Sequence, residues 1–181
     1  RFSQVQRMIH QAVDQIELAR NKDVREISHL LHPMLIRFGL GPAVGMLADH
    51  YREHFEVQLV IGEHLSALEA AEGGDSINES IRLDAYRIVE EALTNVLKHA
   101  DATFVTIDLD VTAEHVLVIR IKDNGRGMNL RGRSHGLGFM MITARAEELH
   151  GRLQVHSAPG EGLEIVVELP LAPSQEEEAL G

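Results

Sequence analysis

The 181-residue sequence predicts an α+β fold, in which a two-layer α/β sandwich with a mixed, mostly antiparallel sheet carries its helices on one face. A long N-terminal helix is expected to precede the sandwich. Two patterns predict this arrangement: short segments in the second half alternate apolar with polar residues, and segments with one apolar stripe at helical spacing lie between them. Hydrophobic residues form 44% of the chain, which is enough for a folded core.

In the first half, apolar residues at helical spacing predict a helix over 3–31, which Pro33 should end. A breaker of glycines and proline then opens a second helix over 42–54, with Pro42 in its first turn. A short strand follows at Glu56–Ile61, and the polar, glycine-rich stretch Ala70–Ser80 is expected to be a loop.

The second half is more regular. Strict alternation of apolar and polar residues, as in VTIDLDV, is typical of a half-buried strand. The expected elements are a helix over 80–99, strands over 103–111 and 115–122, an irregular segment over 124–137, a helix over 138–150, and strands over 152–157 and 163–169.

The helix over 80–99 carries a polar stripe beside its apolar one. Glu91, Asn95 and His99 are four residues apart and therefore share a face. A solvated helix face is one interpretation. Asparagine forms helices poorly, however, and its amide oxygen is a hard ligand suited to Mg²⁺, which is the alternative.

Two further segments combine glycine with polar groups. Asp123 opens DNGRGM at a strand end, where a tight turn is one interpretation and a carboxylate that accepts a hydrogen bond from the adenine amine is the other. In SHGLGF, Gly136 and Gly138 open a helix, and free amides at a helix start can cradle phosphate. The turn Ala158–Gly162 is interpreted as structural.

Together, these motifs resemble those of the GHKL (Bergerat-fold) ATPases. EALTNVLKHA is similar to the N box, DNGRGM to the first glycine box, HGLGF to the second, and LHGRLQVHSAPGEGLEIVVELP to the closing strands, so the resemblance covers about 80–170. KHA and the run ending in ARAEELHG resemble the catalytic domain of two-component sensor histidine kinases, in the subfamily paired with helix-turn-helix response regulators.

The resemblance implies ATP and Mg²⁺ as cofactors, and it implies roles by position. Residues 124–137 would be the lid over ATP, with Arg126, Arg131 and Arg133 as further phosphate partners. The implied catalytic residues are Glu91 and Asn95, with Asn95 also the metal ligand, and the implied cofactor-binding residues are Asn95, Lys98, His99, Asp123, Gly125, Gly127, Met128, Gly136, Leu137 and Gly138.

Two positions depart from the pattern of the family. Met141 stands where the family commonly has glycine, and Leu163 stands where it commonly has a threonine whose hydroxyl lies near adenine. These departures keep open a degenerate ATP-binding or dimerisation module without kinase activity. An anti-sigma-factor-type serine kinase is the enzymatic alternative, although that class usually lacks the helix expected over 3–31.

The resemblance also implies domains and partners. Residues 1–41 would be the second dimerisation helix and its connector, 42–172 the ATP-binding catalytic domain, and 173–181 an acidic tail. The partners would be a response regulator of the helix-turn-helix type and, in the full-length protein, a second copy of the chain. The expected location is the cytoplasm, including the cytoplasmic part of a membrane-bound sensor.

Composition excludes other classes. With 28 acidic and 17 basic residues, the net charge of −11 excludes a broad surface for nucleic acid, and the absence of cysteine excludes disulfides and thiolate metal sites. No apolar run approaches the roughly 20 residues that span a bilayer, so no membrane contact is expected from this chain. The chain starts at Arg1, so we expect a fragment of a longer protein.

The histidines raise two further questions. His10 and His29 both lack the acidic neighbour of a phosphate-accepting histidine, so we expect the acceptor to lie outside this chain. His50, Glu53 and His54 fit the H-x-x-E-H pattern of inverted zinc proteases, but a five-residue match arises easily in a chain with 11 histidines. We interpret it as an exposed helix face.

If the acceptor is absent, incubation of this chain with labelled ATP and Mg²⁺ leaves no acid-labile phosphate on it. The measurement is autoradiography before and after acid treatment. An acid-labile label on the chain would contradict the expectation.

Overall fold

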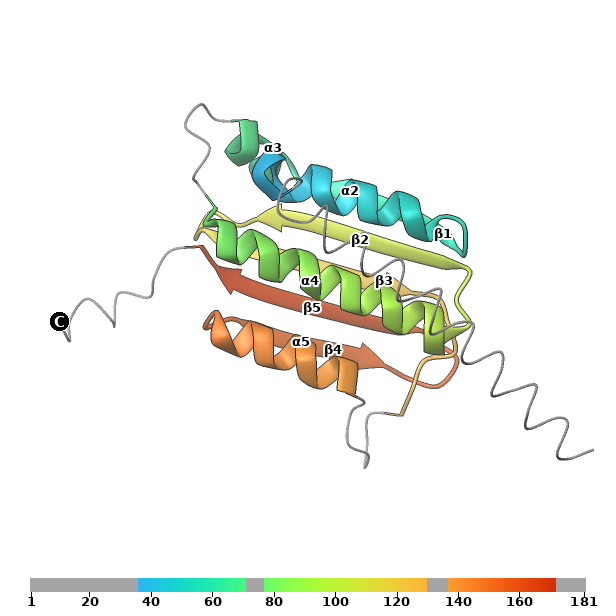
Figure 1. The fold of residues 1–181 in the computed structure, drawn as a ribbon. Helices are drawn as coiled ribbons and strands as arrows, with labels where there is room; N and C mark the ends of the chain where they lie inside the picture. The colour runs from blue at the N-terminus through green and yellow to red at the C-terminus, as the bar shows by residue number, and fades with distance from the viewer. Residues whose placement is uncertain (1–35, 71–76, 130–136, 172–181) are drawn as a thin grey trace, which may run out of the picture.

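The protein, described by a computed structural model over residues 36–70, 77–129 and 137–171, forms two layers, in which helices cover one face of a five-stranded sheet (Figure 1). The expected helix over 3–31 and the acidic tail lie outside these residues. The elements, in order, are η1 (Ile36–Phe38), α2 (Leu40–Tyr51), β1 (Glu56–Ile61), α3 (Glu63–Ala70), α4 (Glu79–Asn95), η2 (Val96–Ala100), β2 (Phe104–Val111), β3 (Val116–Asp123), α5 (Leu137–Glu148), β4 (Arg152–Ser157) and β5 (Leu163–Pro170).

The sheet has the strand order β1-β2-β3-β5-β4. Only β1 and β2 pair in parallel; the other neighbouring pairs are antiparallel. This confirms the mixed, mostly antiparallel sheet. Apolar residues of β2 and β3 alternate with polar ones, and the apolar set is buried against α2, α4 and α5, which lie side by side over that face (Figure 1).

Helix α4 lies centrally on the sheet because its apolar residues form one continuous stripe. Ala85, Ile88, Val89, Ala92 and Leu93 are all buried in the core. The neighbouring stripe is left facing α5, and this stripe carries the polar residues singled out by the sequence. The packing of one stripe therefore fixes where the other points.

The start and end of α4 differ slightly from the helix expected over 80–99. The helix begins at Glu79 because the side chain of Asn78 accepts a hydrogen bond from the amide of Ser80 at 2.9 Å. After Asn95 the chain continues as the π-helical segment η2 and ends at Asp101 in the left-handed conformation. Residue periodicity cannot distinguish one π turn from a longer α-helix, so this segment was not predicted.

Helix α2 spans Leu40–Tyr51, so the boundaries expected for it, 42 and 54, were both wrong. Its early start has a tertiary cause: a carboxylate oxygen of Glu69, on α3, accepts hydrogen bonds from the amides of Leu40 at 2.5 Å and Gly41 at 3.4 Å. These are unpaired donors of a first helical turn, so a distant acidic residue replaces a local cap. Pro42 lies in the first turn, as expected.

Because α2 ends at Tyr51, the H-x-x-E-H motif does not lie on one helical face as expected. His50 is on the helix, whereas Glu53 and His54 follow its end. Helix α3 was not expected either. It contributes one fully buried side chain, Leu65, and the amide of Leu65 donates to the Oδ1 atom of Asp110 on β2 at 3.1 Å.

The described core begins before residue 42. Ile36 and Leu40 belong to the same cluster of buried side chains as the strands and α4. The division into residues 1–41 and 42–172 stays a prediction. In the part of the chain that the structure describes, no helix has the length and apolar character to cross a bilayer.

Candidate nucleotide-binding site

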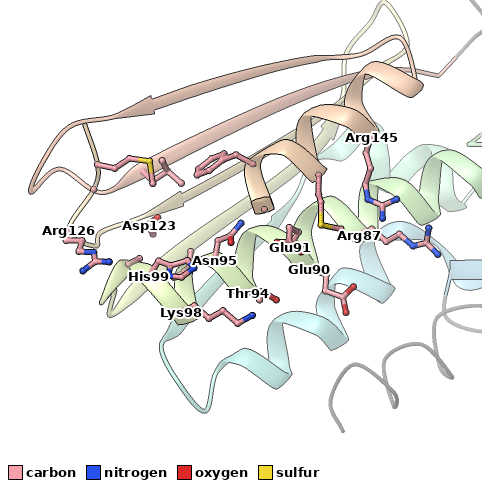
Figure 2. Close-up of a pocket in the computed structure, with 18 residues that line it drawn as sticks. Arg87, Glu90, Glu91, Thr94, Asn95, Lys98, His99, Asp123, Arg126 and Arg145 are labelled. Carbon is pink, nitrogen blue, oxygen red and sulfur yellow. The ribbon is translucent and has the colours of Figure 1, made fainter. Parts of the chain in front are cut away.

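A cavity of about 880 Å³ lies between α4 with η2 on one side and, on the other, the start of α5 and the ends of β3 and β5. This volume is in the range of sites that hold a small molecule or cofactor. Figure 2 shows the labelled side chains in a row, with Asp123 and Arg126 at one end and Arg87 and Arg145 at the other. The lining residues are Arg87, Glu90, Glu91, Thr94, Asn95, Val96, Lys98, His99, Ala100, Asp123, Arg126, Gly127, Met128, Gly138, Phe139, Met141, Arg145 and Leu163.

The wall formed by α4 presents Glu91 and Asn95, both half-buried and one helical turn apart. The amide nitrogen of Asn95 is buried and has no hydrogen-bond partner among the described residues. Unsatisfied buried polar groups are rare in folded proteins, and they often mark a place where a ligand or ion completes the bonding. The side chain of Asn95 therefore fits a site that a bound group completes.

The opposite wall comes very close to these two side chains at Gly138. A Cβ atom at this position would lie 2.5 Å from the amide nitrogen of Asn95 and 2.6 Å from Oε1 of Glu91. A larger residue here would displace both side-chain tips, so glycine lets the first turn of α5 rest on the two polar groups as they stand. Leu137 opens α5, although its side chain and the whole of Gly136 lie outside the described residues.

Asp123 lies at the far end of the cavity, as the last residue of β3, and only 3% of its surface is exposed. Burial raises the pKa of its carboxyl above the ordinary value of 3.8, although hydrogen bonds from the backbone amides of Gly125 and Leu163 act in the opposite direction. The Gly125 amide donates to Oδ1 at 2.7 Å. A buried carboxylate destabilises the fold unless hydrogen bonds or an opposite charge compensate it.

Leu163 stands directly opposite Asp123 in the pairing of β3 with β5, and it also lines the cavity. Side chains opposite each other in an antiparallel pair lie on the same face of the sheet. The position where the family commonly has threonine is thus beside the buried carboxylate. In this chain it supplies an apolar surface and no hydroxyl.

The loop after β3 is fastened mainly through its backbone. The amide of Arg126 donates to the carbonyl of Ala100 at 2.8 Å, and the amide of Met128 donates to the hydroxyl of Ser157 at 2.8 Å. The side chain of Asn124 accepts from the amides at the start of β2, at residues 103 and 104, both at 3.0 Å. This structural role of Asn124 was not predicted.

The two glycines of the loop have different positions. Gly127 lines the cavity with φ +60°, and a Cβ atom there would lie 2.0 Å from the carbonyl oxygen of Ala158. Gly125 does not line the cavity; it packs against Ala100, whose carbonyl oxygen would be 2.3 Å from an added Cβ. Both are needed for packing of the loop, but only Gly127 faces the cavity.

Basic side chains lie along the cavity. Lys98 and His99, on η2, are exposed. The guanidinium of Arg126 lies 3.9 Å from the carboxylate of Asp101. At the other end, Arg145 of α5 donates to Asp84 of α4 at 2.8 Å, and Arg87 lies 4.0 Å from the same oxygen atom. These basic groups share the lining with the acidic side chains Glu90, Glu91 and Asp123.

The structure thus brings together, around one cavity, most of the residues that the sequence singled out. Those that line it are Glu91, Asn95, Lys98, His99, Asp123, Gly127, Met128 and Gly138, together with Arg126, Met141 and Leu163. Arg131 and Arg133 lie outside the described residues. The functional roles of all these residues, whether they line the cavity or not, stay predictions.

Sequence reasoning missed several lining residues, among them Arg87, Thr94 and Arg145. A signal for Arg87 was present, because it lies four residues before Glu91 on the same polar stripe. Arg145 lies seven residues after Gly138 and so returns to the same face of α5. Extending each stripe by one or two turns would have found both.

The raised pKa of Asp123 predicts a pH-dependent cost in stability. For a folded-state pKa above the unfolded value, stability is fully present below the unfolded pKa and is lost as pH rises through the folded pKa. Asp123→Asn removes this pH-dependent loss and keeps one oxygen that can accept a backbone amide. Without nucleotide, we expect the melting temperature of the variant, relative to that of the wild type, to rise as pH increases from 3.8. A difference in melting temperature that stays constant between about pH 4 and 8 would contradict this.

Comparison with known proteins assigns a family. The sequence profile described as "Histidine kinase-, DNA gyrase B-, and HSP90-like ATPase" matches residues 80–173. This range includes all of α4 except its first residue, both glycine motifs and the closing strands. It is more than half of the chain.

Curated relatives are histidine kinases. The chain is 28% identical over 151 residues to the signal transduction histidine-protein kinase/phosphatase DegS of Brevibacillus brevis, covering 82% of this chain and 37% of DegS. It is 31% identical over 153 residues to the sensor histidine kinase ComP of Bacillus subtilis, covering 81% of this chain and 19% of ComP. The chain therefore spans well under half the length of these relatives.

Solved structures share the fold. A blue-light activated histidine kinase from Erythrobacter litoralis superposes with a TM-score of 0.61 at 19% identity, covering 76% of this chain and 43% of that one. The histidine kinase AdeS of Acinetobacter baumannii gives a TM-score of 0.52 at 14% identity, with coverage of 72% and 64%. With the profile match over residues 80–173, the chain belongs to the family of histidine kinase-, DNA gyrase B- and HSP90-like ATPases.

Proposed function

We propose that this chain is the ATP-binding catalytic domain of a sensor histidine kinase, which donates the γ-phosphate of ATP to a histidine outside this chain. One observation carries the proposal: a single cavity holds the buried carboxylate of Asp123 at one end and, farther along, the half-buried pair Glu91 and Asn95 under Gly138. The family match and the histidine kinases among the relatives support the same activity.

The geometry suggests how adenine is recognised. The carboxylate of Asp123 is an acceptor, so it binds the exocyclic amine of adenine and repels the oxygen that guanine carries at the corresponding position. Leu163 and Met128 line the same end and offer apolar contact to the base. Because the carboxylate is buried, its hydrogen bond to the base is formed away from competing water.

The phosphates are then directed along α4. Asn95 offers its amide oxygen as a ligand for Mg²⁺. Its buried amide nitrogen, which has no partner among the described residues, can donate to a phosphate oxygen. Magnesium, when bound, neutralises charge that develops on the phosphates during transfer. Lys98 and His99 line the cavity beside Asn95 and can pair with phosphate oxygens. Glu91, one turn along, orients the groups at the reacting end.

The remaining functions concern the longer protein. The phosphorylated histidine would pass its phosphate to an aspartate of a response regulator of the helix-turn-helix type. The kinase would act as a homodimer through helices that include residues 3–31, and in the cytoplasm. The similarity of residues 87–100 and 136–151 to that subfamily of histidine kinases supports these assignments.

The two departures from the family pattern both lie in the cavity wall. Met141 and Leu163 are apolar and line a cavity that retains a volume of about 880 Å³. Neither removes a charged group from the site. This favours a domain that holds nucleotide over a degenerate one.

Titration calorimetry with ATP and Mg²⁺ tests the proposal. We expect the wild type to bind ATP in preference to GTP. Asp123→Asn loses the charged acceptor for the adenine amine, which should weaken ATP binding by about 10- to 100-fold. Asn95→Asp places a second negative charge near the phosphates and should abolish binding. Unchanged affinity in both variants would refute the proposal.

Gly138→Ala tests the close approach of α5. The added methyl group pushes the tips of Asn95 and Glu91 aside, so we expect ATP affinity to fall by about tenfold or more, while alanine's better helix propensity offsets part of the cost to the fold. Gly45→Ala on α2 is the matched control, because its nearest neighbour would be a methyl group of Leu59 at 3.8 Å. Equal ATP affinity for Gly138→Ala and Gly45→Ala would show that the contact is irrelevant to binding.

A further inference from the structure

The cavity has a direction, and its two ends differ in character. Asp123 and Leu163 close one end with a buried carboxylate and an apolar side chain. Arg87 and Arg145 lie at the opposite end, as Figure 2 shows. With the base at Asp123, which is the proposed function on which this inference rests, the phosphates of a nucleotide extend toward the two arginines.

The spacing along α4 supports this direction. Asn95, Glu91 and Arg87 follow one another at intervals of four residues, so each lies about 6 Å farther along the helix and on nearly the same face. If the inner phosphates lie at Asn95, the terminal phosphate points beyond it, toward Glu91 and Arg87. A long arginine side chain can reach back over about one turn.

Acidic side chains also line this end of the cavity. Glu90 and Glu91 both line it, and carboxylates repel a phosphate. Beyond the proposed Mg²⁺ at Asn95, a positively charged side chain at this end would offset that repulsion. Among the described lining residues, Arg87 and Arg145 are the cations nearest to this end in Figure 2.

The two arginines are not equivalent. Arg145 donates a hydrogen bond to Oδ1 of Asp84 at 2.8 Å, and 24% of its side chain is exposed. Arg87 lies 4.0 Å from the same oxygen atom, beyond hydrogen-bond distance, and 35% of its side chain is exposed. The same carboxylate oxygen thus lies near two guanidinium groups, but only that of Arg145 is within hydrogen-bond distance.

We propose that Arg87 contacts the terminal phosphate of the bound nucleotide, while the Arg145–Asp84 pair acts as a positioning pair that holds α5 against α4. The guanidinium of Arg87 gives up only a long contact to Asp84 when it turns to the phosphate. It gains charge-assisted hydrogen bonds of the forked type that arginine makes with phosphate. Asp84 stays paired with Arg145, so no carboxylate is left uncompensated.

This assignment predicts a difference between ATP and ADP, because only ATP has the third phosphate. In titration calorimetry with Mg²⁺, Arg87→Gln should weaken ATP binding by about tenfold or more and ADP binding by less than about twofold. Arg87→Lys keeps the positive charge but lacks the forked guanidinium. Its loss of affinity should therefore be smaller and again confined to ATP.

Arg145→Gln is the matched control on the other side of Asp84. Because this residue joins α5 to α4, its loss should lower the melting temperature and weaken ATP and ADP by similar factors. An equal effect of Arg87→Gln on both nucleotides, or none on either, would overturn the proposed contact. If a thermal melt shows that Arg87→Gln is not folded, the test uses Arg87→Lys instead. The measured quantity is again the loss of ATP affinity relative to the loss of ADP affinity.

The two proposals fail in different ways. If the wild type binds neither ATP nor ADP, the proposed function and this inference are both wrong. If the wild type binds both and Arg87→Gln leaves their ratio unchanged, the site binds nucleotide and only the role of Arg87 is refuted.

Discussion

The packing of α4 on the sheet is the interaction on which the rest of the structure depends. Its buried stripe, from Ala85 to Leu93, contacts the strands, while α2 and α5 pack along its two sides. Because an α-helix is rigid, fixing one stripe fixes the directions of all the others. The polar stripe, which includes Glu91 and Asn95, is therefore pre-organised before any ligand arrives. Gly138 then lets α5 close over it without a side chain in between.

Whereas the packing of α4 stabilises the fold, the buried carboxylate of Asp123 lowers its stability. Its burial raises its pKa, which means that the folded state tolerates the charge less well than water does. Two backbone amides offset this only in part. The proposed role of Asp123 in nucleotide recognition gives a reason for a carboxylate that lowers the stability of the fold. The loop that supplies the Gly125 amide is part of the same arrangement.

Much of this was predictable from sequence because the patterns were local. Alternation identified β2 and β3 within one residue, and the stripe on α4 identified Glu91 and Asn95 together. The failures have tertiary causes. Helix α2 starts early because Glu69 of another helix binds its first amides, and η2 departs from α-helical geometry without any change in residue pattern. The pairing of Arg145 with Asp84, 61 residues away, likewise has no local signal, although the helical spacing from Gly138 places Arg145 on the cavity face.

The loop after β3 has a consequence for how such a site can change over evolutionary time. Both backbone polar groups of Arg126 are bonded, its amide to Ala100 and its carbonyl to the amide of Gly160 at 2.7 Å, whereas 64% of its side chain is exposed. The amide of Met128 is likewise fixed, to Ser157. The backbone at these two positions is thus held through main-chain groups rather than through the side chains of Arg126 and Met128. Substitutions there can therefore change the chemistry of the cavity rim while the path of the backbone stays the same.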